Sequence, residues 1–270
     1  MPRDYGFRTI NGSTTLVTVP ASATLNNRSI GTWMVVCQTN NISPPTQRNL
    51  VSKSSGANLN GVLHTASGWV FQYGGGSGGG QVVMNLSATQ GNMPGLQNNR
   101  PIVFAVTYSH GVSGSLYAGL VGQPLVEPTT YAARVLGTMG VVPHDDSASA
   151  LGLCATPAGA NVIDGFYWSI QFWGEVLPLD VLQQRARDYN PVNTLGSWRF
   201  GPTGLGVVLD DSGHGGHAPV TSTSSPVLAS DTPLVHRRGV RWDPMRDERA
   251  IAAVPPSATE TASLFVSTPA

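Results

Sequence analysis

Charged side chains are scarce in this sequence of 270 residues. They make up 11% of the chain, against about 25% in ordinary soluble domains. Acids and bases balance at 15 each, and Lys53 is the only lysine. Because no basic stripe is present to neutralise phosphates, we do not expect a nucleic-acid partner. A near-neutral, charge-poor surface associates readily, which fits either a protein packed against copies of itself or partners, or a secreted β-protein with an uncharged surface.

Long apolar runs are also missing. No stretch approaches the roughly 18 apolar residues of a membrane-spanning helix, so no membrane segment is expected. The opening segment MPRDYGFRTINGSTTL contains no apolar core of the length that a secretory signal needs. We therefore expect synthesis in a host cytoplasm without a signal peptide.

Cysteine is nearly absent, since Cys37 and Cys154 are the only two. Both lie in predicted strands, and a disulfide is possible if those strands are neighbours. Cytoplasmic synthesis favours two buried free thiols instead. Two cysteines with no histidine placed beside them do not complete a zinc site, and we expect no metal or other cofactor.

The chain does contain a series of short strand patterns separated by turn residues. Residues 33–38 and 102–108 show the clearest alternation of side chains between two faces. The other predicted strands cover residues 16–19, 49–53, 61–65, 69–73, 82–86, 115–121, 151–154 and 166–173. No strong helical period appears before Leu179. The series predicts an all-β fold in which two antiparallel sheets pack face to face.

Residues 165–191 differ from the rest because a strand is followed by a helix. Strict alternation in the strand predicts one face made of Phe166, Trp168, Ile170 and Phe172, and another made of Tyr167, Ser169, Gln171 and Trp173. A short helix then begins near Pro178, a residue that the first helical turn tolerates. Apolar and long side chains recur at helical spacing up to Tyr189, so one side of the helix is expected to rest on a sheet.

The composition changes after about Gly206. Residues 1–205 are predicted to form one domain, and residues 206–270 an extended C-terminal arm that is rich in Ser, Thr, Pro and Ala. Such a segment does not bury enough apolar surface to fold alone. We expect it to pack along its own domain or onto neighbouring subunits through the anchors Leu234, Val240, Trp242, Leu264 and Phe265.

Five sequence elements in order resemble the concanavalin A-like jelly roll in its laminin-G-like form, including versions in bacteriophage particle proteins. They are LVTVP at 16–20, GTWMVVCQ at 31–38, LVSK at 50–53, FAVTYSHGVSGSLYAGLVGQPL at 104–125, and the strand and helix of 165–191. The resemblance covers roughly residues 10–200. It implies a jelly-roll sandwich with one short helix. The acidic residue that the family carries early in the last strand is replaced here by aromatic residues, and its usual Asp-Gly turn by Ala118-Gly119, which weakens a carried-over calcium or glycan site.

Aromatic side chains suggest one candidate binding site. Rings stack on the apolar faces of sugars, and a shallow glycan site on the concave sheet would use Tyr117, Gln171 and Trp173, if these point away from the core. Alternatively, these residues cover the helix or a neighbouring subunit. The Glu-x-Asp-x-x-Glu strand of glucanases on this fold does not occur, so no enzymatic activity is expected.

Two other polar groups are candidates for metal binding. His144, Asp145 and Asp146 form a loop that is read either as a cation site or as solvated. His214 and His217 follow two aspartates in a glycine-rich segment, which fits a turn better than a transition-metal site.

Two functions remain after this reading. The first is a non-enzymatic virion protein, a capsid decoration or head-associated component that contacts other virion proteins and itself. The alternative is a lectin-like adhesion module that binds a cell-surface glycan. The charge-poor composition and the resemblance favour the first, whereas the aromatic faces favour the second.

Overall fold

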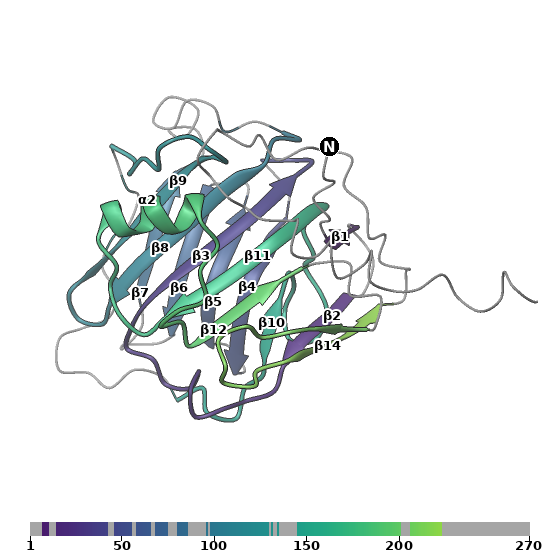
Figure 1. The fold of residues 1–270 in the computed structure, drawn as a ribbon. Helices are drawn as coiled ribbons and strands as arrows, with labels where there is room; N and C mark the ends of the chain where they lie inside the picture. The colour runs from purple at the N-terminus through teal and green to yellow at the C-terminus, as the bar shows by residue number, and fades with distance from the viewer. Residues whose placement is uncertain are drawn as a thin grey trace, which may run out of the picture.

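Two antiparallel sheets that pack face to face form this protein (Figure 1). The computed structural model describes residues 7–10, 15–42, 46–55, 58–65, 68–74, 80–85, 96, 98–129, 131, 134, 145–200 and 206–222. One helix, α2 (Leu179–Arg187), occurs in this part of the chain. The predicted two-sheet sandwich with a short late helix is therefore confirmed. No helix among the described residues is long and apolar enough to cross a membrane.

The six-stranded sheet has the order β1-β11-β3-β8-β9, and β12 also pairs with β11. Its strands are β1 (Phe7–Thr9), β3 (Ile30–Thr39), β8 (Ile102–Ser109), β9 (Ser113–Leu120), β11 (Gly165–Trp173) and β12 (Gly196–Arg199). The eight-stranded sheet has the order β13-β14-β2-β10-β4-β5-β6-β7. Its strands are β2 (Thr15–Val19), β4 (Arg48–Ser55), β5 (Asn58–Thr65), β6 (Gly68–Gly74), β7 (Gly80–Asn85), β10 (Leu151–Leu153), β13 (Val207–Val208) and β14 (Ala218–Ser222).

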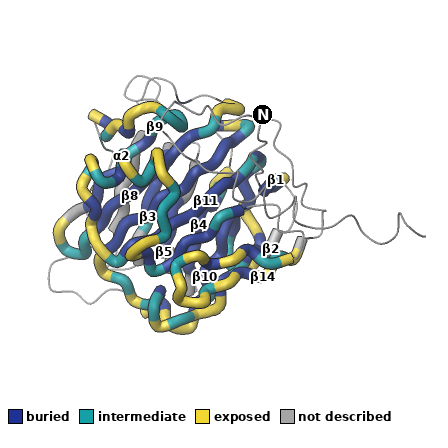
Figure 2. The backbone as a smooth tube through the Cα atoms, viewed as in Figure 1, coloured by how far each residue is buried: buried dark blue, intermediate teal, exposed yellow. Residues whose placement is uncertain are grey.

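The main core lies between the two sheets. Rings from opposite sheets meet there, with centroids 4.8 Å apart for Trp69 and Phe104 and 4.7 Å apart for Phe71 and Tyr108. The predicted alternation of residues 33–38 and 102–108 is confirmed, since every second side chain of each strand enters this core. Figure 2 shows the strands buried at the centre and the exposed residues gathered in the loops around them.

Cys37 and Cys154 are free thiols, both fully buried in the main core. Burial raises the pKa of each thiol well above its usual value, and the proximity of Cys37 adds to the rise at Cys154. Low thiolate content makes both groups weak nucleophiles. Of the two states left open by the sequence, the structure has the reduced one.

A β-bulge in β11 overturns the predicted division of residues 166–173 between two faces. The pairing of β11 with β3 shifts register between Tyr167 and Ser169. Tyr167 therefore enters the main core, although strict alternation placed it opposite Ile170 and Phe172, which are also in that core. Phe166 and Trp168 lie on the outer face instead. The extra residue of a bulge breaks the period of two, and the three consecutive large aromatic side chains of residues 166–168 give no sign of it.

Helix α2 covers part of that outer face. Leu182 of the helix is buried together with Trp168 and Trp173 of β11, Met34 of β3 and Ala105 of β8. The prediction that one side of the helix packs on a sheet is confirmed. Figure 1 shows α2 in front of the six-stranded sheet.

Residues 206–222, predicted as the start of the arm, contribute β13 and β14 to the eight-stranded sheet, where β14 pairs with β2. The sandwich therefore extends to Ser222 rather than ending at residue 205. The predicted anchors Leu234, Val240, Trp242, Leu264 and Phe265 lie outside the described residues.

Candidate functional site

The edge of β12 that does not pair with β11 carries a connected group of polar side chains. Beyond β12, residues 210 and 211 run along this edge, because Trp198 forms an isolated bridge with Asp210 and the Asp211 N–H donates to Ser197 O at 2.7 Å. Side chains that are opposite one another across a sheet share a face. Ser197 and Asp211 therefore lie side by side.

The carboxylate of Asp210 fixes this segment from the buried side. Its Oδ1 accepts from the backbone N–H of Ser197 at 2.9 Å and of Ser212 at 3.0 Å, and its Oδ2 accepts from the N–H of Gly216 at 2.9 Å. Burial raises the pKa of Asp210, but hydrogen bonds from Ser212, Ser197 and Gly216 outweigh it and hold the pKa below its usual value. Asp210 thus stays ionised and anchors residues 210–216.

On the outer side of the same edge, four side chains form what we call the Tyr189 cluster: Tyr189, Ser197, Arg199 and Asp211. The Tyr189 hydroxyl donates to Asp211 Oδ2 at 2.9 Å and shares a 2.8 Å hydrogen bond with Ser197 Oγ. The Arg199 guanidinium carbon lies 5.4 Å from the centroid of the Tyr189 ring, and its Nε is 3.9 Å from Asp211 Oδ2. Each member is therefore held in place by another.

Tyr189, Arg199 and Asp211 of the Tyr189 cluster reach solvent, whereas Ser197 is fully buried. The side chains of Arg199 and Asp211 are 40% and 33% exposed. Burial raises the pKa of the Tyr189 hydroxyl well above its usual value, and the Asp211 carboxylate raises it further, so the hydroxyl remains a donor. A ring, a carboxylate and a guanidinium together offer apolar surface, acceptors and donors within one small area.

The predicted glycan residues Gln171 and Trp173 point to the outer face but are buried there, 2% and 1% exposed. Trp173 lies beneath α2, and Gln171 Nε2 donates to Asn190 O at 3.1 Å and Ser197 Oγ at 3.2 Å. Neither is accessible to a sugar in this structure, which corrects their expected exposure. Gln171 instead supports the Tyr189 cluster from behind. Tyr117 is half-buried on the outer face and packs against the side chains beneath α2.

His214 and His217 belong to no candidate metal site in the structure. Among the described residues, no group of three or more potential metal ligands occurs. His217 Nδ1 accepts from the Asp210 N–H at 3.0 Å. Trp198 Nε1 donates to Gly216 O at 2.7 Å. These bonds give the segment a structural role in closing the sheet edge.

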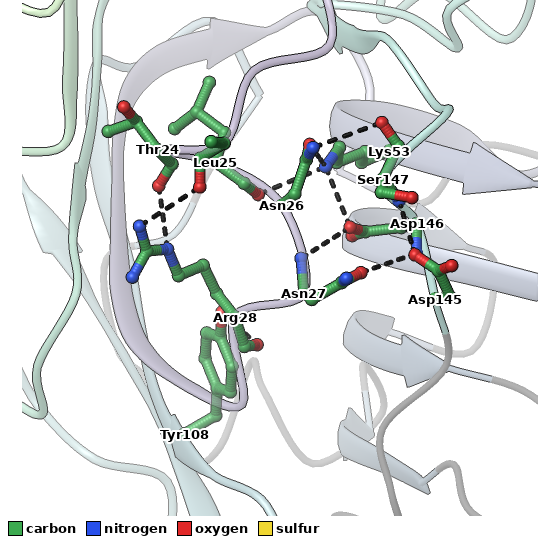
Figure 3. A network of polar contacts seen from close by, with 11 residues as sticks. Thr24, Leu25, Asn26, Asn27, Arg28, Lys53, Tyr108, Asp145, Asp146 and Ser147 are labelled. Carbon is green, nitrogen blue, oxygen red and sulfur yellow. Dashed lines mark hydrogen bonds and ion pairs between the residues drawn. The ribbon is translucent and has the colours of Figure 1, made fainter.

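The loop that contains Asp145 and Asp146 forms a second polar network, far from this edge in sequence (Figure 3). Asp146 and Asn27 exchange two hydrogen bonds, of 2.7 and 2.8 Å. The buried Lys53 ammonium donates to Asp146 Oδ1 at 2.8 Å, Asn26 Oδ1 at 2.6 Å and Leu25 O at 3.2 Å. An ammonium thus occupies the position among these oxygens that a metal cation could otherwise take. The sequence predicts either a solvated loop or a cation site here. Asp146 fits neither alternative, because it is buried and forms an ion pair with Lys53. His144 lies outside the described residues.

Sequence reasoning missed the Tyr189 cluster. The sequence pattern places Tyr189 on the apolar side of the helix and predicts no strand over residues 196–199. The alternation of Ser197 and Arg199 around Trp198 was the available signal. The composition places the partner segment, residues 210 and 211, in the predicted arm.

Comparison with known proteins shows the fold. No protein-family model and no curated protein sequence matches the chain. A proposed carbohydrate-binding protein from Bacteroides ovatus ATCC 8483 is similar in structure, with a TM-score of 0.56 and 13% identity over 87% of this chain. The chain spans 62% of the length of that protein.

Two other structures have lower similarity. The sialidase CBM40 of Ruminococcus gnavus, bound to α2,3-sialyllactose, has a TM-score of 0.42 and 14% identity over 67% of this chain and 95% of its own. The enzymatically active domain of tailspike protein 2 from bacteriophage CBA120 has a TM-score of 0.39 and 14% identity over 66% of this chain and 31% of its own. At these identities, the likeness to the Bacteroides protein shows a shared antiparallel β-sandwich.

Proposed function

We propose that this chain is a non-enzymatic, lectin-like module that binds a glycan at the Tyr189 cluster. The observation that carries this proposal is the rigid, solvent-facing arrangement of Tyr189, Arg199 and Asp211. Sugar sites combine an apolar platform with a few fixed polar groups. The fold shared with a proposed carbohydrate-binding protein is in keeping with this function, although a fold alone does not determine function.

The placement of the two acids supports binding rather than hydrolysis. Glycosidases use two carboxyl groups that flank one scissile bond. Asp210 is opposite Trp198, whose side chain is in the main core, whereas Asp211 is opposite Ser197 and reaches Tyr189 on the outer face. The two carboxylates therefore face different sides of the strand edge and do not approach one substrate together.

A screen of immobilised oligosaccharides tests this proposal. The wild-type protein should bind a subset of glycans, and Tyr189→Ala should lose that binding because the ring and its contact with Asp211 disappear. Tyr117→Ala is the matched control, since it removes the same side chain from the same sheet face at the strand on its opposite edge. Loss of binding in Tyr117→Ala with retention in Tyr189→Ala would place the site elsewhere, provided thermal unfolding shows both variants folded.

A virion location is the second candidate, favoured by the scarcity of charge in the sequence. In this role the segment after residue 222 would attach the sandwich to capsid or head components or to another copy. Mass spectrometry of purified particles from the source would test it. Many copies per particle would support it, and absence from particles would leave a free glycan-binding module. The two functions are compatible, because a particle-bound module can also touch a cell surface.

A further inference from the structure

One face of the Tyr189 ring is covered within the Tyr189 cluster itself. The Arg199 guanidinium lies over the ring, with its central carbon 5.4 Å from the ring centroid. A ligand therefore finds only the remaining surface of this ring. Binding sites for small ligands combine apolar surface with a few fixed polar groups, so further apolar contacts must come from a neighbouring side chain.

Leu209 lies beside the cluster on the same outer face. Asp210 forms an antiparallel bridge with β12, which places Leu209 opposite Arg199. Residues that are opposite one another across an antiparallel pair share a face. Exposure alternates along the segment in agreement with this placement, since Val208 and Asp210 are buried. Leu209 and Asp211, by contrast, are exposed.

Leu209 is an apolar side chain that is fixed in position and still open to a ligand. It is 49% exposed. Its backbone is held by the bridge on β12 and by the neighbouring Asp210 carboxylate, which accepts three backbone N–H groups. A single exposed leucine is ordinary on a protein surface, but this one adjoins fixed polar groups. Little backbone entropy is lost when a ligand covers such a side chain.

Asp211 supplies a hydrogen-bond acceptor next to this apolar surface. Its Oδ2 accepts from the Tyr189 hydroxyl at 2.9 Å. Its other oxygen, Oδ1, accepts no hydrogen bond within the part of the chain that the structure describes. Leu209 and Asp211 are two residues apart on an extended segment, and so about 7 Å apart. One sugar residue can therefore donate a hydroxyl to Asp211 and rest an apolar group on Leu209.

We propose that the ligand of this module is a neutral sugar that carries a methyl group, and that Leu209 selects this group. The inference rests on the proposed glycan-binding function and adds the class of ligand and a specificity-determining residue. The Asp211 carboxylate favours a neutral sugar over an acidic one, because like charges repel. The methyl group is either C6 of a 6-deoxyhexose or part of an acetamido group, since both present the same apolar contact.

The test uses an array in which sugars with and without a methyl group are printed in pairs. The pairs are L-fucosides beside L-galactosides, L-rhamnosides beside L-mannosides, and N-acetylglucosaminides beside glucosides. Wild-type protein should bind the methyl-bearing member of at least one pair about fourfold more tightly, as expected when one apolar carbon is removed from water.

Replacing Leu209 should remove this preference without removing the site. Leu209→Asn, which has a similar shape but is polar, should bring the ratio of affinities within the pair close to one. Binding of the member without a methyl group should be retained, because Tyr189 and Asp211 are unchanged. Leu209→Ala, which is shorter but apolar, should keep part of the preference.

Val126→Thr is the matched control. Val126 is an apolar side chain of similar exposure, 45%, and it bridges Ala118 of β9 at the opposite edge of the six-stranded sheet. The change to threonine makes an apolar side chain polar at nearly constant shape and should leave the ratio as in the wild type. Thermal unfolding of each variant establishes that it is folded.

The outcomes separate this inference from the function on which it rests. Preference in the deoxy pairs alone, or in the acetamido pair alone, would support the inference and identify the source of the methyl group. Equal binding of both members of every pair, or a preference that survives Leu209→Asn, would overturn the inference and leave the glycan-binding function in place. Absence of binding to any sugar, with or without a methyl group, would overturn both proposals.

Discussion

Replacing Lys53, the only lysine of the sequence, should destabilise the fold because its ammonium is buried in an ion pair with Asp146. The side chains of Lys53 and Asp146 are each only 4% exposed, and their charged atoms are 2.8 Å apart. Breaking a buried ion pair by removing one partner costs about 3–5 kcal/mol, because the remaining charge is left without compensation. In Lys53→Met the aliphatic stem is nearly preserved, so the loss measures the ammonium and its three oxygen contacts.

The assay is equilibrium denaturation by urea, with the change in unfolding free energy taken from the shift of the midpoint at constant slope. We expect Lys53→Met to lose about 3–5 kcal/mol at pH 7. The double variant Lys53→Met/Asp146→Leu should lose less than the sum of the two single variants, because it removes both charges together.

A loss below about 1 kcal/mol in Lys53→Met would refute this reasoning, since that is the range of exposed ion pairs. Strict additivity in the double variant would equally show that the two charges do not depend on each other. Arg100→Met serves as the control, because Arg100 is exposed and its replacement removes one positive charge without disturbing a buried network.

Two further predictions concern buried ionisable groups. The pKa of Asp210 is lower in the folded protein than its ordinary value, so its stabilising effect is complete above about pH 4, the ordinary value of an aspartate, and disappears as the pH falls through the folded pKa. Asp210→Asn should therefore lower the free energy of unfolding by about 1–3 kcal/mol at pH 7. Between about pH 5 and 2 its stability in urea should fall less steeply than that of the wild type. Equal pH profiles of stability for the two proteins would contradict this. Cys37 and Cys154 should not react with a thiol reagent at pH 8 in the folded protein because they are buried, and both should react in denaturant; rapid labelling of either thiol in the folded state would show that the core opens.

The sequence was sufficient to predict most of the strands, because large side chains alternate cleanly in β3 and β8 and strand-forming residues sit between turns. It was not sufficient where the chain departs from the period of two. The bulge at Trp168 reverses the faces of neighbouring residues, yet Phe166, Tyr167 and Trp168 are all large and aromatic, so hydrophobicity does not distinguish the faces.

The candidate site was harder to predict because it depends on pairing between distant segments. Arg199 and Asp211 become neighbours only when residues 210 and 211 cover the edge of β12. The polar, glycine-rich composition of residues 206–222 indicated an arm, whereas β14 joins the sheet through backbone hydrogen bonds that need few large side chains. The sequence left open which face Gln171 takes. It lies on the outer face, but the covering by residues 189–197 that buries it has no signature in the strand itself.

A crystal structure of the protein with the tightest-binding oligosaccharide from the screen would test glycan binding at the Tyr189 cluster most directly. Our account predicts sugar density against Tyr189 and Arg199 on the outer face of the six-stranded sheet. Density on the eight-stranded sheet, or on the face beside Tyr117 with Tyr189 untouched, would contradict it.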